Sequence, residues 1–114
     1  MSPNAKALSY GLSQDTLQKI NSVLAQHPEV ESAILYGSRA IGTFRPGSDI
    51  DLTLTGEQLT LSILLRIDTE IDDLLLPYLF DFSILSHIHS PTLLDHIHRV
   101  GIPLYERAAK NEVL

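Results

Sequence analysis

Residues 37–51 read GSRAIGTFRPGSDID, and this stretch decides the fold. It follows directly on the apolar end of residues 30–36, which predict a strand entering the core. It ends in Asp-Ile-Asp, which opens a segment over 49–55 where polar and apolar residues alternate, so a second strand is predicted there. The glycines, proline and arginines between the two strands indicate a functional loop rather than a helix or strand.

The two acids at the end of this stretch point to a cation. Asp49 and Asp51 are two residues apart on the predicted strand, so both side chains are expected on the same face, with Cα atoms roughly 7 Å apart. Two carboxylates that face the same way repel each other unless a cation lies between them, and Mg²⁺ or Mn²⁺ suits such oxygen ligands. Asp81 adds a third acid if its strand lies beside theirs. The alternative is a set of solvated acids on the polar face of an edge strand.

The glycine and serine at the start of the stretch are candidates for phosphate binding. Gly37 lets the backbone approach a ligand closely, and N–H groups in a following helical turn can receive a phosphate. The Ser38 hydroxyl adds a donor, and Arg39 or Arg45 is placed to neutralise phosphate charge. The alternative for a Gly-Ser pair is a simple turn.

The remaining segments predict alternating helices and strands. Ser13 is a suitable N-cap for a helix that Pro28 ends, and Pro91 suits the first turn of a later helix. The predicted elements, in order, are a helix from 13 to 28, strands over 30–36 and 49–55, a helix over 61–77, a strand over 78–85, a helix over 91–100 and a short edge strand over 102–105. We therefore predict a mixed α/β domain over 13–106, a loose leader over 1–12 and a frayed tail over 107–114.

Composition limits the classes of function. The chain has 114 residues, 44% of them hydrophobic, which suits one domain. A formal net charge of −6 argues against a protein that binds nucleic acid through the phosphate backbone. Cysteine is absent, so disulfides and thiolate metal sites are excluded. No signal peptide or membrane segment is recognised, and we expect a cytoplasmic protein without membrane contact.

The pattern Gly-Ser, ten residues, Asp-x-Asp resembles the signature of the polymerase-β-type nucleotidyltransferase superfamily. A chance match to four such residues is on the order of one in a thousand for a chain of this length. The short chain resembles the minimal members, the MNT proteins, which pair with HEPN-domain partners in toxin–antitoxin operons. The resemblance covers residues 13–106. It implies an α/β (α+β) nucleotidyltransferase core with a mixed sheet of three to four strands packed with helices.

The resemblance also implies roles for individual residues. Gly37 and Ser38 match the phosphate-contacting pair, with Arg39 beside them in the nucleotide site. Asp49 and Asp51 match the two metal-binding carboxylates, and Asp81 matches the third, so the three acids are expected to be both catalytic and metal-binding.

The implied activity is Mg²⁺-dependent transfer of AMP from ATP to a tyrosine hydroxyl of a HEPN toxin, which would neutralise the toxin. Two ions are expected, with Mn²⁺ as an alternative metal. The implied partners are ATP and the HEPN protein, in a homo-oligomer or a hetero-oligomer with the toxin, and no direct nucleic-acid binding is expected.

Two alternative functions stay open from the sequence. One is a stand-alone nucleotidyltransferase that acts on a small hydroxylated molecule. The other is a non-catalytic, nucleotide-binding antitoxin that works by occlusion.

A group of four histidines is compatible with a metal site, but their spacing favours a structural or surface role. These histidines are His87, His89, His96 and His98.

Overall fold

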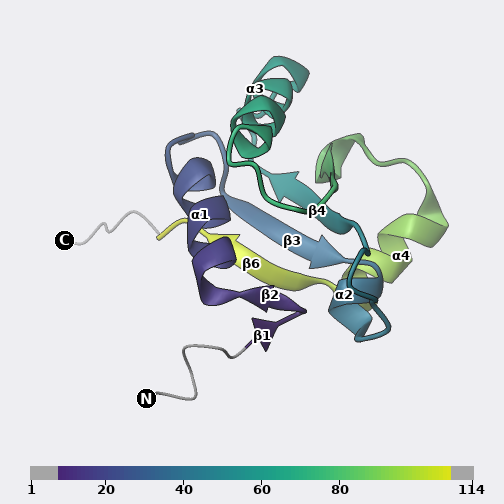
Figure 1. The fold of residues 1–114 in the computed structure, drawn as a ribbon. Coiled ribbons are helices and arrows are strands. Elements are labelled where there is room, and N and C mark those ends of the chain that lie inside the picture. Colours follow the sequence, from purple (N-terminus) through teal and green to yellow (C-terminus); the bar gives the residue numbers. More distant parts are fainter. Residues whose placement is uncertain (1–7, 109–114) are drawn as a thin grey trace.

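A four-stranded mixed sheet forms the centre of the protein (Figure 1). The computed structural model describes residues 8–108. The strand order is β5-β4-β3-β6, and only the β4–β5 pair is parallel. The strands are β3 (Ser32–Tyr36), β4 (Ile50–Thr55), β5 (Phe80–Ile84) and β6 (Ile102–Glu106). The predicted mixed α/β architecture is confirmed, and β6 is the predicted edge strand.

Helices α1 (Gln14–Ala25) and α3 (Leu61–Asp72) pack on one face of the sheet, while α4 (Pro91–Val100) lies on the other side of β3 (Figure 1). The Ser13 side chain caps α1 by accepting a hydrogen bond from the Thr16 N–H, as the sequence predicts. Pro91 occupies the first turn of α4, also as predicted. Helices α1 and α3 end before Pro28 and Pro77, and a short non-helical segment lies between each helix and its proline.

The two faces of the sheet differ in polarity. The hydrophobic core lies between the sheet and helices α1 and α3, and it includes the fully buried residues Leu35 on β3 and Leu52 on β4. Strand residues alternate between faces, so the neighbours of these leucines point the other way. That second face carries polar side chains on β4 and β5, and we call it the polar face. Burial of one face thus leaves the other available for chemistry.

Part of the predicted leader forms a hairpin. Strands β1 (Leu8–Ser9) and β2 (Leu12–Ser13) pair antiparallel, and Leu12 is fully buried. The turn residues Tyr10 and Gly11 have φ of 59° and 78°, the backbone of a type I′ turn. Residues 8–12 therefore correct the expectation of a loose leader. Residues 1–7 of the leader and 109–114 of the predicted tail lie outside the described residues.

No helix within residues 8–108 has the length and hydropathy that a membrane span requires.

Candidate active site

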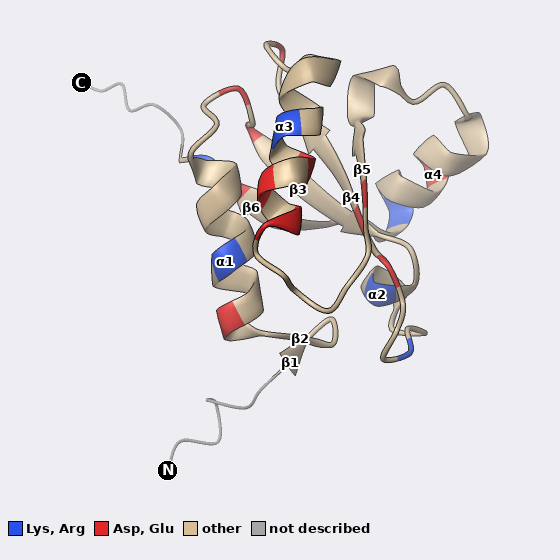
Figure 2. Ribbon diagram, turned by 45° about the horizontal axis from the view of Figure 1, so that its top comes forward, with Lys and Arg blue, Asp and Glu red and all other residues tan. Residues whose placement is uncertain are grey.

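A row of three polar side chains crosses the sheet at the start of β4. The register pairs Asp51 with Tyr36 on one side and with Asp81 on the other. Paired residues in neighbouring strands point to the same face, so all three side chains share the polar face. Figure 2 shows the acidic positions of β4 and β5 side by side next to helix α2 (Ser38–Ile41). We call Tyr36, Asp51 and Asp81 the acidic row.

Asp81 takes its orientation from its neighbours in the sequence. Phe80 and Phe82 flank it on β5, stack on each other with ring centroids 5.6 Å apart, and pack against the core. Alternation along the strand therefore turns Asp81 to the polar face, where it is exposed.

Asp49 lies immediately before β4 and is exposed, rather than on the strand as predicted. It still belongs to the same electrostatic group. Burial raises the pKa of Asp51, and the negative charges of Asp81 and Asp49 raise it further, while His96 acts in the opposite direction. Burial also raises the pKa of Tyr36, with Asp81 and Asp51 acting in the same direction and Ser83 opposing them. The three acids therefore repel one another within a single site.

Gly37 fits closely against the acidic row. Its φ of 77° lies in the left-handed region, and a Cβ at this position would collide with the Asp51 carboxylate. Its carbonyl accepts hydrogen bonds from the N–H groups of Ala40 and Ile41, so the chain turns directly into α2, where Ser38 is the first residue. The predicted loop over 37–48 thus contains a short helix, and Gly37-Ser38 lies beside the Asp51 carboxylate.

His96 is a site residue that the sequence did not single out. Its Nε2 accepts a hydrogen bond of 3.1 Å from the Gly37 N–H, across 59 positions of sequence. Its ring packs edge-on against Tyr36, with centroids 6.1 Å apart. His96 is half-buried, whereas His87, His89 and His98 are exposed. No local pattern distinguishes His96 from these three, because its partners come from β3 and the turn that follows it.

Arg39 does not take the place expected for a nucleotide contact. Only 2% of the residue is exposed, and its guanidinium donates to the carbonyl oxygens of Ser48 and Tyr10. It also lies over the rings of Phe44 and Tyr78, about 5 Å from each centroid. These contacts join loop 37–48 to the N-terminal hairpin, and burial keeps the guanidinium away from a ligand in solvent. Arg45 is the exposed arginine of this loop.

The donor set suits a cation that binds together with a phosphate ligand. Within residues 8–108, no three His, Cys, Asp or Glu side chains form a preformed metal-binding group. Magnesium commonly takes one or two carboxylates and completes its coordination with water and substrate phosphates. Asp51 and Asp81, paired in register and destabilised by mutual repulsion, fit that use, with Asp49 beside them.

Comparison with known proteins identifies a family for this chain. The family model described as polymerase beta, nucleotidyltransferase matches residues 18–110. No curated protein matches the sequence significantly.

Several solved structures share the fold. A toxin–antitoxin complex with AMP-PNP is 22% identical, with a TM-score of 0.65 over 80% of this chain and 73% of that one. A tri-AMPylated Shewanella oneidensis HEPN toxin in complex with its MNT antitoxin gives 20% identity and a TM-score of 0.61, over 82% and 72%. An MntA–HepT toxin–antitoxin structure gives 20% and 0.61, over 83% and 74%.

The raised pKa of Asp51 makes a prediction about stability. The fold disfavours the ionised carboxylate, so the cost is present above the folded-state pKa and disappears as the pH falls toward the ordinary value of 3.8. Asp51→Asn should therefore raise the melting temperature of the metal-free protein at pH 7, and the gain should shrink as the pH falls. Asp73→Asn, at an exposed position outside the acidic row, is the control. A gain for Asp51→Asn that does not vary with pH would contradict the assignment.

The close fit of Gly37 predicts a second effect on stability. Gly37→Ala forces a side chain into the left-handed region and against Asp51, so it should cost about 1–3 kcal/mol or more of unfolding free energy. Gly47→Ala is the matched control, because a Cβ there meets nothing within 4 Å, and it should change stability by about 0.5 kcal/mol or less. Urea denaturation measures both. Equal effects would mean that the turn at Gly37 is not held against Asp51.

The hydrogen bond to His96 predicts a tautomer. Since Nε2 accepts from the Gly37 N–H, a neutral His96 must carry its proton on Nδ1. ¹⁵N NMR of histidine-labelled protein at pH 8 should show this tautomer for His96, and the Gly37 amide should exchange slowly with solvent. His98, which is exposed, provides the comparison in the same spectrum. An Nε2-protonated His96 would rule out the hydrogen bond.

Proposed function

Because the chain belongs to the polymerase β nucleotidyltransferase family, we propose that it transfers AMP from ATP to a tyrosine hydroxyl of a HEPN-domain toxin and thereby acts as an antitoxin. The observation that carries this proposal is the acidic row beside the Gly37 turn. It puts two carboxylates in register, a third next to them, and the Gly37-Ser38 turn against the Asp51 carboxylate, all within one small region.

In the proposed reaction, the acceptor oxygen attacks the α-phosphorus of ATP. A bond forms between that oxygen and phosphorus, the bond from phosphorus to the bridging oxygen of the β-phosphate breaks, and pyrophosphate leaves. The hydroxyl proton passes to Asp81, which is the most accessible member of the acidic row. The product is a phosphodiester between AMP and the acceptor.

Asp49, Asp51 and Asp81 are the proposed ligands of Mg²⁺. Bound there, Mg²⁺ would neutralise charge on the triphosphate and on the acceptor oxygen. Ser38, at the first position of α2, would donate its hydroxyl to a phosphate oxygen, next to the backbone of Gly37. Arg39 is left out of the proposed nucleotide contacts because its guanidinium is buried in the loop.

The HEPN partner is supported by the solved structures that share this fold. One of them is an AMPylated HEPN toxin in complex with an MNT antitoxin, and another holds AMP-PNP in a toxin–antitoxin complex. The net negative charge of this chain would repel the phosphates of a nucleic acid, so a protein is the better acceptor.

The test is an AMP-transfer assay with a HEPN-domain toxin, sought in the gene next to the one that encodes this chain. With ATP and Mg²⁺, intact-mass spectrometry should show the partner gaining AMP on a tyrosine, and a chelator should abolish the gain. Asp81→Asn should lower transfer by about 100-fold or more, since it removes a proton acceptor and metal ligand. The same variant should still bind AMP-PNP through Ser38 and the other two acids.

Asp73→Asn is the matched control and should transfer AMP like the wild type. If Asp81→Asn neutralises the toxin fully without modifying it, the protein works by occlusion and the proposal is wrong. If AMP appears on a small hydroxylated molecule but never on the partner, the protein acceptor is wrong.

A further inference from the structure

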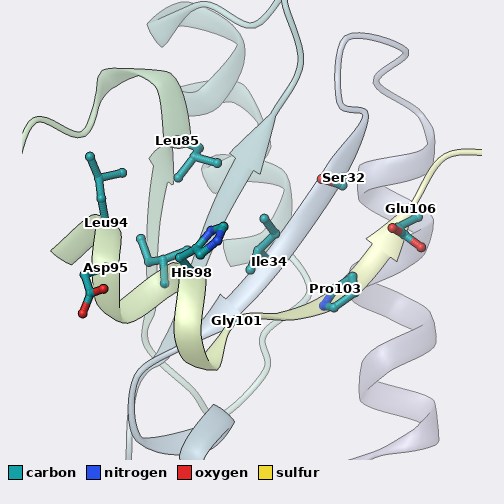
Figure 3. A pocket seen from close by; sticks show the side chains of 10 residues that line it. Ser32, Ile34, Leu85, Leu94, Asp95, His98, Gly101, Pro103 and Glu106 are labelled. Atoms are coloured by element: carbon teal, nitrogen blue, oxygen red, sulfur yellow. The ribbon is translucent and has the colours of Figure 1, made fainter. Parts of the chain in front are cut away.

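A hollow on the polar face lies one side-chain row from the acidic row. It has a volume of about 600 Å³ and lies between α4 and strands β3 and β6. Figure 3 shows Leu94 and His98 on one side, from α4, and Ile34 and Pro103 on the other, from β3 and β6. We call this hollow the α4 groove.

The α4 groove continues the face that carries the acidic row. Ile34, in its floor, is two residues before Tyr36 on β3, so it is one side-chain row, or roughly 7 Å, from the acidic row. The groove therefore lies one side-chain row from Tyr36, the residue of β3 that pairs with Asp51. The groove is thus positioned for a molecule that presents a hydroxyl to the acids.

The far end of the groove is acidic. Glu106 lines it, and a smaller hollow of about 260 Å³, which shares Leu85 with it, is lined by Glu31 and Glu57. The ion pairs of the described residues are Lys19–Asp15, His27–Glu70 and Arg99–Asp95, so none of them involves these three glutamates.

Arg107, the residue after Glu106, forms no ion pair with these glutamates within residues 8–108. Arg107 donates its guanidinium to the carbonyl oxygens of Val30, Ala25 and His27. Glu106 in the groove and Glu31 and Glu57 in the adjoining hollow therefore make this end of the α4 groove negatively charged, beside a floor that is mainly apolar. A ligand that binds here gains most if it carries positive charge at that end.

We propose that the α4 groove is the docking surface for the protein acceptor, and that it binds a segment whose apolar side chains are flanked by Lys or Arg. This proposal rests on the proposed function, because it takes the acceptor to be a protein. It places the basic end of the segment at Glu31 and Glu106 and the acceptor hydroxyl at the acidic row. Apolar contact gives affinity, and the glutamates give orientation.

Charge reversal tests the acidic end of the groove. Glu31→Lys with Glu106→Lys should weaken calorimetric binding of the HEPN-domain partner by about tenfold or more and flatten its salt dependence. Both residues are exposed, so the fold should be retained. The matched control is Asp68→Lys with Asp73→Lys, which changes the net charge equally on exposed positions in or next to α3 and should bind like the wild type.

Truncation tests the apolar floor independently of charge. Leu94→Ala should weaken partner binding, whereas Leu65→Ala, at an exposed leucine of α3, should not. AMP-PNP binding should be unchanged in all these variants, because none of them touches the acidic row or the Gly37 turn.

The outcomes separate this proposal from the proposed function. If the wild type binds the partner but never modifies it, the proposed function fails, and the binding data still decide the role of the groove. If both groove variants bind the partner as tightly as the wild type, the groove is not the docking surface, even where AMP transfer is normal.

Discussion

The parallel pairing of β4 and β5 sets Asp51 directly beside Asp81, and the rest of the site is arranged around that pair. Antiparallel pairing on the other side of β4 adds Tyr36 to the same row. The chain then leaves β3 through Gly37, where the absence of a side chain leaves room for the Asp51 carboxylate. Strand register thus brings Tyr36, Asp51 and Asp81 from three strands to one end of the polar face, and Gly37 joins them from the turn after β3.

This arrangement of carboxylates lowers the stability of the protein when no cation is bound to them. Burial raises the pKa of Asp51, the charges of Asp81 and Asp49 raise it further, and none of the ion pairs among the described residues involves these acids. A buried apolar face against α1 and α3 provides the stability that the polar face lacks. Repulsion of this kind is typical of functional sites, because a ligand of opposite charge then binds where the protein alone is strained.

Much of the fold could be predicted from local patterns. Strand β4 is predicted by the alternation of polar and apolar residues over 49–55, and the start of helix α1 is predicted by the capping residue Ser13. Both patterns are local in the sequence, and both elements are present. The first hairpin was missed because its strands have two residues each and its turn begins with Tyr10, which rarely adopts a positive φ. Tyr10-Gly11 between two Leu-Ser pairs was the available signal.

The parts of the candidate site that depend on contacts between distant residues could not be predicted from the sequence. Asp51 and Gly37 share a recognisable motif, so both could be named. The burial of Arg39 depends on carbonyl groups in the hairpin and the loop, and the contact of His96 with Gly37 depends on how α4 packs against β3. The Tyr10 carbonyl is 29 positions from Arg39 and Gly37 is 59 positions from His96, and the spacing of the four histidines does not distinguish one from another.

We propose that the acidic row and the Gly37 turn together bind a metal–nucleotide complex. Anomalous diffraction from crystals grown with Mn²⁺ and AMP-PNP tests it most directly. We expect manganese peaks in coordination with Asp51 and its neighbouring acids, and phosphate oxygens within hydrogen-bond distance of Ser38. Manganese and nucleotide bound elsewhere, with the carboxylates of Asp49, Asp51 and Asp81 free of metal, would contradict it.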